Sequence, residues 1–271
     1  MKIVCISDTH NLHRATAVPD GDILIHAGDI TVAGDAREVA DFNTWLGTLP
    51  HKHKVVVAGN HDFCFENSPQ KTKALLTNAH YLQDSGVEIE GLFIWGSPVS
   101  PHYHDWAFNR KRGSEIRRHW KLIPPHTDLL ITHCPPFGIL DTSNRGSHEG
   151  CRDLLDVLQQ RVRPRLHVFG HIHEAHGYTT IGTTQYVNAS IVGPKGWTRR
   201  FWLLNQLTQL GIRIFRLFQW LKNLFWKTTP AQHHSSTLSQ FQWEVAHAAI
   251  VIETASLSTD PNFRAPSKSL L

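Results

Sequence analysis

The chain has 271 residues, of which 41% are hydrophobic, and its formal net charge is +4 at pH 7. This length suits one large domain, or a domain with an appendage, and nine Trp and thirteen Phe can build a substantial core. The small positive charge gives no indication of a nucleic-acid partner, because such proteins usually concentrate basic residues more strongly.

Cysteine usage and the first residues both bear on the compartment. The four cysteines have no CxxC spacing and no pattern of a small secreted domain, which predicts reduced thiols. Met1-Lys2 runs directly into a short strand-like stretch, where a signal peptide would show a long apolar segment. We therefore expect a cytoplasmic protein.

Short apolar runs alternate with amphipathic stretches along residues 1–196, which predicts a layered α/β domain. One helix is expected to start near Asp35, with Asp35 and Glu38 forming its cap, and a second is expected from Gly150 to Val162. A long loop is expected over residues 96–109. The strands are expected at residues 3–6, 23–25, 55–57, 86–89, 92–95, 129–131, 166–169 and 248–252.

Residue types that bind metals follow five of these apolar runs. The carboxyl ends of buried parallel strands are where α/β folds collect their chemistry, so we expect these side chains to meet. One such cluster alone would more often be an ordinary turn, but the joint occurrence of five indicates a two-metal site. The clusters are Asp8-Thr9-His10, Gly28-Asp29, Gly59-Asn60-His61-Asp62, Thr132-His133 and Gly170-His171-Ile172-His173.

The clusters supply two sets of ligands that share one carboxylate, Asp29. Mixed imidazole and carboxylate ligands suit Mn, Fe, Zn or Ni better than Ca. Two ions about 3.5–4 Å apart can share a hydroxide, lower its pKa and clamp the phosphoryl oxygens of an in-line displacement, which predicts a phosphoric ester hydrolase. The first set is Asp8, His10, Asp29 and His173, and the second is Asp29, Asn60, His133 and His171.

The order of these motifs, DxH, GD, GNHD, TH and GHxH, resembles the calcineurin-like metallophosphoesterases. Over about residues 1–192 the chain is similar to their metallophosphoesterase-domain-containing subfamily, the foetal-brain-type proteins and their bacterial relatives. Some members of that subfamily lack the first His of GHxH and are poorly active; this chain keeps His171, which favours an active enzyme. The supporting stretches are Gly96-Ser97-Pro98, 106–109, 132–136, 161–170 and Asn188-Ala189-Ser190.

The resemblance implies a four-layer α/β/β/α sandwich with two central mixed sheets and a dinuclear metal site. It also implies hydrolysis of phosphodiesters or phosphomonoesters, and we expect small nucleotide-like phosphodiesters as substrates. Two alternatives stay open: a nucleotide-binding regulator of low activity, and a membrane-associated scaffold.

The resemblance also implies roles for the residues that follow Asn60. His61 would orient the scissile phosphate or protonate the leaving oxygen, with Asp62 as the catalytic partner that orients it. Many relatives use an acid three residues after the bridging Asp; that position is Val32 here, so Asp35 is a second candidate. Asn188 is expected as a neighbour of the site.

The chain changes character near residue 196. A heptad row of Leu and Ile over 197–227 predicts an amphipathic helix, or two helices broken at Gly211. Its charged residues exclude a transmembrane span. Peripheral membrane contact, packing on the domain and self-association are three open alternatives for it, with membrane contact preferred. The predicted division is 1–196 catalytic domain, 197–243 helical insertion and linker, 244–255 returning strand and 256–271 disordered tail.

Other histidines and one loop admit plainer interpretations. His51, His53, His102 and His104 are expected to be solvated surface residues. An alternative for His102 and His104 is that they line a base or sugar pocket together with Asp105 and Asn109, although ordinary loop packing is preferred. Arg145 and His148, in the loop before the second helix, either meet a substrate phosphate or lie in a solvated loop.

Overall fold

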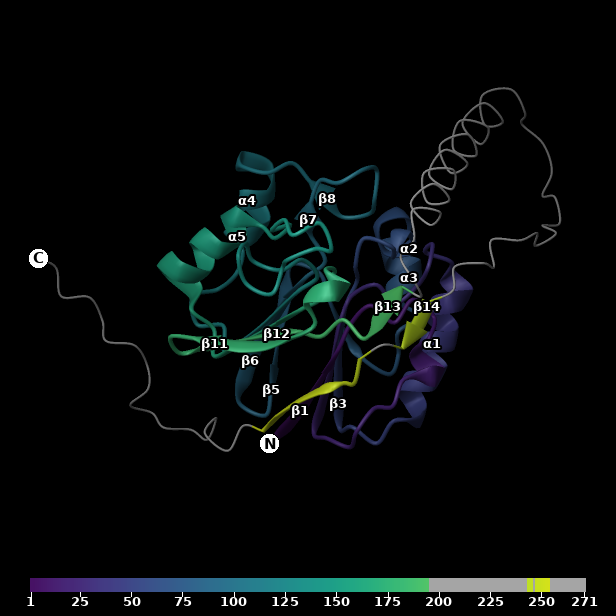
Figure 1. Ribbon diagram of the computed structural model, residues 1–271. Helices are drawn as coiled ribbons and strands as arrows, with labels where there is room; N and C mark the ends of the chain where they lie inside the picture. The colour runs from purple at the N-terminus through teal and green to yellow at the C-terminus, as the bar shows by residue number, and fades with distance from the viewer. Residues whose placement is uncertain (195–242, 246, 254–271) are drawn as a thin grey trace, which may run out of the picture. The chain divides into compact units, whose positions relative to one another are not determined.

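Two mixed β-sheets lie at the centre of the fold (Figure 1). The structure is a computed structural model that describes residues 1–194, 243–245 and 247–253. The first sheet has the strand order β15-β1-β2-β3-β4, and the second has the order β11-β12-β10-β9-β6-β5. The first contains β1 (Lys2–Ile6), β2 (Ile23–Ala27), β3 (His53–Val57), β4 (His80–Leu82) and β15 (Ile250–Glu253). The second contains β5 (Ser85–Ile89), β6 (Leu92–Ser97), β9 (Leu129–Thr132), β10 (Leu166–Phe169), β11 (Gly177–Ile181) and β12 (Thr184–Asn188).

The inner strands of both sheets are parallel, whereas β15, β11 and β5 join antiparallel at the edges. In the second sheet, β6, β9, β10 and β12 pair in parallel. The carboxyl ends of these parallel strands therefore lie at one edge of each sheet, as the clustering of polar motifs requires. The remaining short strands are β7 (Ser100–Pro101), β8 (Asn109–Arg110), β13 (Val192–Pro194) and β14 (Trp243–Val245).

The two sheets pack face to face over one hydrophobic core. Alternate residues of β1, Ile3 and Cys5, belong to this core together with residues of β9 and β10 such as Ile131 and Val168. Successive side chains of a strand point to opposite faces. Central strands such as β9 and β10 are covered on both faces, so they appear in the sequence as continuous apolar runs.

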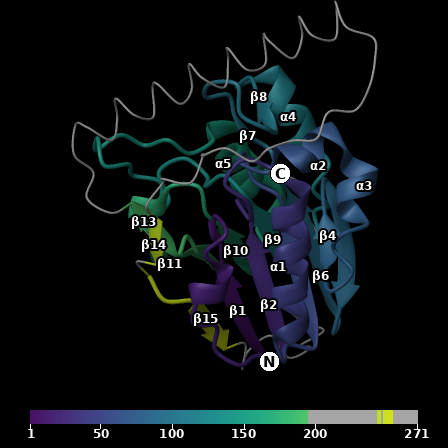
Figure 2. The same ribbon diagram turned by 90° about the vertical axis from the view of Figure 1, so that its right-hand side faces the viewer.

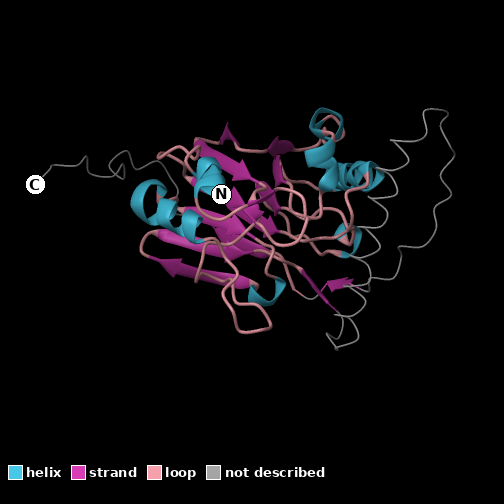
Figure 3. Cartoon of the chain, turned by 90° about the horizontal axis from the view of Figure 1, so that it is seen from above, coloured by secondary structure: helices cyan, strands magenta, loops and turns pink. Residues whose placement is uncertain are grey.

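Helices cover the outer face of each sheet (Figures 2 and 3). Helix α1 (Ala36–Thr48) buries Val39, Phe42, Trp45 and Leu46, and its Phe42 ring contacts His26 of β2. Helices α4 (Ser114–Trp120) and α5 (Arg152–Val157) pack on the second sheet in a separate core. The other helical segments are η1 (His13–Ala15), α2 (Phe63–Asn67), α3 (Pro69–Lys73), η2 (Leu158–Val162) and η3 (His173–Ala175).

The prediction of an α/β fold with two mixed sheets is confirmed. The helix expected from Gly150 to Val162 is observed as α5 and η2, and the strand expected at 248–252 is β15 at the edge of the first sheet. No helix among the described residues is both long enough and apolar enough to span a bilayer. The insertion helix expected at 197–227 and the tail expected from 256 lie outside the described residues, and the domain division stays a prediction.

Three local expectations were wrong in whole or in part. The segment 96–109 is not one loop, because β6 continues to Ser97 and β7 pairs with β8 within it. The expected cap of α1 is only partly observed: Asp35 is the N-cap as expected and accepts from Arg37 N, but the Glu38 carboxylate takes no part in the cap and accepts from Asn11 and from Val32 N. His51 is buried, with 2% of its surface exposed, at the amino end of β3.

Candidate metal centre

The ligand motifs occupy sharp turns at the ends of their strands. Asp8, His10, Asp29 and His171 all have positive φ angles, of 56°, 40°, 55° and 71°. Residues with side chains adopt this left-handed conformation only where surrounding contacts hold it, and such residues cluster at functional sites. The turns bring side chains from separate strand ends into one buried space.

Glycines in three of the motifs allow this close approach. A Cβ on Gly28 would lie 2.4 Å from His133 Nδ1, and one on Gly59 would lie 2.3 Å from Asp29 Oδ1. A Cβ on Gly170 would lie 2.1 Å from the Oδ2 atom of Asp8. Each of these glycines is therefore required by the packing of the neighbouring motif, which explains why GD, GN and GH recur in the sequence.

Asp29 lies at the centre of the site. Its Oδ2 atom is 3.4 Å from His133 Nε2, 3.8 Å from His10 Nε2 and 4.0 Å from His61 Nε2. Its other oxygen, Oδ1, accepts a hydrogen bond of 2.8 Å from the backbone N–H of His61. One carboxylate thus faces an imidazole of each predicted ligand set, His10 and His133, and also His61.

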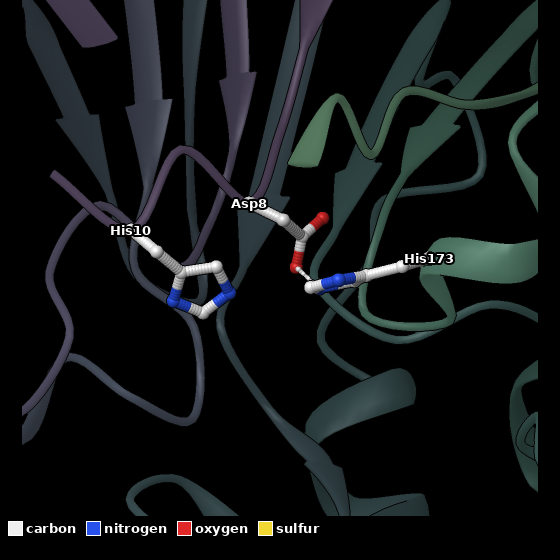
Figure 4. Close-up of side chains that lie close together, drawn as sticks. All are labelled: Asp8, His10 and His173. Carbon is white, nitrogen blue, oxygen red and sulfur yellow. Dashed lines mark ion pairs between the residues drawn. The ribbon is translucent and has the colours of Figure 1, made fainter. Parts of the chain in front are cut away.

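Asp8 forms the second half of the centre (Figure 4). Its Oδ1 atom lies 3.3 Å from His173 Nε2, and the His10 ring lies on its other side. The backbone N–H of His171 donates to both carboxylate oxygens, and Ser190 Oγ donates to Oδ2 at 2.8 Å. Asp8 is therefore held by loops of the second sheet although it follows β1.

Backbone carbonyls fix the tautomers of two imidazoles. His10 Nδ1 lies 3.2 Å from Thr31 O, and His133 Nδ1 lies 3.0 Å from Ala27 O. A carbonyl can only accept, so each Nδ1 carries a proton. Each Nε2 then faces the site, where it is the nitrogen that can bind a metal ion. This arrangement, with a hydrogen bond behind the ligating ring, is typical of metal-bound histidine.

The buried charges of the site compensate one another through histidine. Burial alone would raise the pKa of Asp29, but the neighbouring His133, His61 and His10 together outweigh it and the pKa falls well below its ordinary value. Burial opposes protonation of His133, yet the charge of Asp29 raises its pKa to about 9. The same opposition lowers the pKa of Asp8 and raises that of His173. The raised pKa values of His133 and His173 thus accompany the lowered values of the two buried carboxylates, whereas burial lowers the pKa of His10 and of His171 to about 3.

The donors fit two divalent cations of the predicted kind. Within each of two triplets the ligand atoms all lie within 4.8 Å of one another: Asp8, His10 and His173 form one, and Asp29, His133 and His171 form the other. Asn60 joins the second triplet, because its Oδ1 atom lies 2.8 Å from His133 Nε2. All seven predicted ligands thus meet in one place, and their coordination of an ion stays a prediction.

His61 lies at the edge of the site, and its orienting partner differs from both candidates. Its Nδ1 atom lies 2.8 Å from the main-chain oxygen of Val32, so Nε2 is turned toward Asp29. The Asp35 side chain bonds Arg37 instead. The ring of Trp106 packs against His61 with 4.1 Å between the ring centroids. The residue three positions after Asp29 thus orients His61 through its main-chain carbonyl, which is present whatever the side chain at that position.

Asp62 does not orient His61 either. Its carboxylate accepts from the backbone N–H groups of Ile30, Thr31 and Gly59 and from the Thr31 hydroxyl, so it joins the turn after β2 to the turn after β3. Burial, reinforced by the charge of Asp29, raises the pKa of Asp62 to about 7. Its direct participation in catalysis stays a prediction, and its observed contacts position the loops that carry Asp29 and His61.

Asn188 lies beside the site as expected, whereas the roles of Ser190 and Trp106 were not predicted from the sequence. Asn188 donates from its side chain to Leu140 O and Ile172 O, which holds the turn between the two ligating histidines. The contact of Ser190 with Asp8 had a signal, since Asn188-Ala189-Ser190 was among the stretches shared with the resembled family. Trp106 was also in a shared stretch, but nothing in the sequence placed it beside His61.

The loop that contains Arg145 and His148 is ordered by a buried carboxylate. Asp141 accepts from Gly138 N and Gly150 N, and its Oδ1 atom lies 2.6 Å from His148 Nδ1. Arg145 is exposed. Contact of either side chain with a substrate phosphate stays a prediction.

Comparisons with known proteins agree with this geometry. The family model described as calcineurin-like phosphoesterase matches residues 1–175. Metallophosphoesterase domain-containing protein 1 of Homo sapiens is 44% identical over 214 residues, covering 70% of this chain and 66% of that protein, so the chain spans about two thirds of its length. A UPF0046 protein of Caenorhabditis elegans is 43% identical over 218 residues, covering 72% of this chain and 76% of that protein.

Among solved structures, the crystal structure of TT1561 of Thermus thermophilus has a TM-score of 0.48 and 14% identity, covering 69% of this chain and 88% of that one. This likeness is too low to carry weight. The family match and the identity to the two relatives are sufficient, and they confirm the resemblance inferred from the motifs. The chain belongs to the calcineurin-like metallophosphoesterases.

Proposed function

We propose that this chain is a metal-dependent phosphodiesterase that acts on small nucleotide-like phosphoesters. The observation that carries the proposal is the position of Asp29, whose carboxylate faces the Nε2 atoms of three histidines at 3.4 to 4.0 Å while Asp8 and His173 meet 3.3 Å apart beside it. Two divalent cations held there would lower the pKa of water and neutralise the phosphoryl oxygens.

The protein side chains would hold and orient the remaining participants. Asp8, His10 and His173 would hold one ion, and Asn60 with His133 and His171 would hold the other, while Asp29 would be a ligand of both. The strained turns and the hydrogen bonds behind the rings fix these donors before the substrate arrives, so little reorganisation is needed.

His61 is the residue best placed to handle the leaving group. Its Nδ1 proton is held by Val32 O, so its Nε2 atom, on the edge of the site, is the one that can hold a proton for the departing oxygen. Only 18% of the His61 side chain is exposed, and Trp106 covers one side of the ring. The ring is therefore restricted to one orientation when a substrate binds.

A phosphoester panel tests this proposal. Purified protein is stripped with a chelator, reloaded with Mn²⁺, and assayed on bis(p-nitrophenyl) phosphate, p-nitrophenyl phosphate and 2′,3′- and 3′,5′-cyclic nucleotides. We expect hydrolysis of the diesters that depends on added metal and is absent from the stripped protein. Two bound metal ions without hydrolysis of any ester in the panel would contradict the proposal.

A further inference from the structure

Two buried histidines outside the predicted ligand set occupy related places in the two sheets. His26 belongs to β2 of the first sheet and His167 to β10 of the second, and neither exposes any surface. Each ring reaches the hydroxyl of a threonine that directly adjoins a predicted metal ligand. Thr9 stands between Asp8 and His10, and Thr132 precedes His133.

Hydrogen bonds assign the tautomer of His26. Its Nδ1 atom accepts from the backbone N–H of Gly28 at 3.3 Å, so this nitrogen carries no proton. The proton of the neutral ring is then on Nε2, which lies 2.9 Å from Thr9 Oγ1 and donates to it. Burial lowers the pKa of His26 to about 3, in keeping with a neutral ring. His26 thus joins the turn after β2 to the turn after β1.

His167 makes the corresponding contact in the second sheet. The Thr132 hydroxyl donates to Cys134 O at 2.7 Å, so it accepts from His167 Nε2 at 2.8 Å. The bond from Thr132 to Cys134 spans His133 and closes the turn that presents its ring to Asp29. In the parallel register His167 lies opposite Leu130, two residues before Thr132, so the donor reaches the strand end diagonally.

An apolar side chain could fill the same space at either position. The His26 ring packs against Phe42 of α1, and the His167 ring packs against Phe169 and Tyr186. Both imidazoles therefore lie against aromatic side chains. A buried imidazole in such a place costs desolvation, and what it provides in return is a donor of fixed direction. In both sheets that donor is directed at the hydroxyl next to a ligand.

We propose that His26 and His167 are positioning residues, each of which orients one half of the metal centre through a threonine hydroxyl. His26 acts through Thr9 on Asp8 and His10, and His167 acts through Thr132 on His133. The inference rests on the metal binding that the proposed function includes. It concerns residues that touch neither metal nor substrate, and residues behind the ligands typically change metal affinity by about 10- to 100-fold.

The test is a calorimetric titration of chelator-stripped protein with Mn²⁺. We expect two binding steps in the unchanged chain. His26→Leu should weaken one step by about 10- to 100-fold and His167→Leu should weaken the other. His26→Gln and His167→Gln, which keep a donor near the Nε2 position, should recover most of the affinity. His51→Leu, which removes a buried imidazole at the opposite end of β3, is the matched control and should leave both steps unchanged.

Threonine variants guard against the loss of the fold. Thr9→Val and Thr132→Val remove only the hydroxyl, and each should weaken the same step as its histidine partner. In the double variants His26→Leu/Thr9→Val and His167→Leu/Thr132→Val the two losses should not add, because one hydrogen bond is removed in both.

Any of three results would overturn the inference. They are an equal loss of Mn²⁺ affinity in His51→Leu, fully additive losses in the double variants, and unchanged Mn²⁺ affinity in the folded leucine and valine variants. Two normal binding steps together with an inactive phosphoester panel would instead refute only the proposed function. Absence of Mn²⁺ binding by the unchanged chain would overturn both.

Discussion

The two sheets contribute different chemistry to one site. The second sheet supplies only imidazoles, whereas both carboxylates and the amide come from turns of the first sheet. Each of the two predicted ligand sets takes donors from both sheets, so both sheets are needed to complete the centre. The first sheet contributes Asp8, His10, Asp29, Asn60 and His61, and the second contributes His133, His171 and His173.

The two carboxylates also differ in how they are held. Asp29 accepts from the N–H of His61, which belongs to the same sheet, whereas Asp8 accepts from His171 N and Ser190 Oγ of the other sheet. A parallel bridge between Ser7 and Ser190 lies directly beside this contact. A substitution of Asp8 should therefore disturb contacts between the two sheets, whereas a substitution of Asp29 should disturb contacts within the first sheet.

The largest effect is expected for Asp29→Asn. This carboxylate belongs to both predicted ligand sets, so its loss should remove both tightly bound ions and lower kcat/KM for bis(p-nitrophenyl) phosphate by about a thousandfold or more. Metal content by mass spectrometry and steady-state kinetics with Mn²⁺ measure the two effects. Asp8→Asn should reduce the content by one ion, since Asp8 belongs to one triplet. Asp35→Asn, whose carboxylate bonds Arg37, is the control and should be unchanged.

If Asp29→Asn and Asp8→Asn lost the same single ion, the assignment of Asp29 to both ions and of Asp8 to one would be incorrect. Retention of two ions by Asp29→Asn would show that the shared ligand lies elsewhere.

A smaller effect is expected for His61→Ala. If His61 holds the proton for the leaving oxygen, its loss should lower kcat by about 10²- to 10⁴-fold for a diester with a poor alkyl leaving group. The loss should be much smaller for p-nitrophenolate, which leaves without a proton. Paired kinetics on methyl p-nitrophenyl and dialkyl esters of matched charge measure this difference, with metal content as the control. Equal losses for both leaving groups would assign His61 to binding instead.

The sequence predicted the ligands better than it predicted what holds them. Each ligand follows an apolar run, and parallel strand ends meet at one edge, so the meeting of Asp8, Asp29 and His171 could be inferred without coordinates. The partner of His61 could not, because it is a main-chain carbonyl and carries no signature in the identity of Val32.

Side-chain direction was the other limit. His26 and His167 read as ordinary members of apolar strands, and only the register of the strands shows that each reaches a threonine beside a ligand. His51 was expected on the surface because polar residues near a turn usually are, yet the chain buries it beside Gly21. Contacts between distant segments override local expectations of this kind.

Gly170→Ala should affect the junction of the two sheets. Its Cβ would lie 2.1 Å from Asp8 Oδ2 and 2.2 Å from Ser7 Oγ, so the turn after β10 must move away from the end of β1. We expect a loss of about 1–3 kcal/mol in the free energy of unfolding, together with weaker metal binding. Gly182→Ala is the control: nothing lies near its Cβ, so left-handed strain can reduce stability while metal binding stays normal. Urea unfolding and Mn²⁺ titration measure both quantities, and unchanged metal affinity in a folded Gly170→Ala would contradict the packing argument.

The smallest effect concerns the pH dependence of stability through His167. Burial lowers its pKa to about 3, while an unfolded histidine has a pKa of about 6.5. Below pH 6.5 the unfolded chain therefore binds a proton that the folded chain does not, so stability is full above that pH and falls as the pH drops toward 3. Between pH 7 and pH 5 this one group should cost about 2 kcal/mol of unfolding free energy. Over the same interval the unfolding free energy of His167→Leu should fall by about 2 kcal/mol less than that of the unchanged chain. Urea unfolding at both pH values measures this difference. Parallel pH curves for the two proteins would show that His167 is protonated in the fold, against the neutral donor assigned to it.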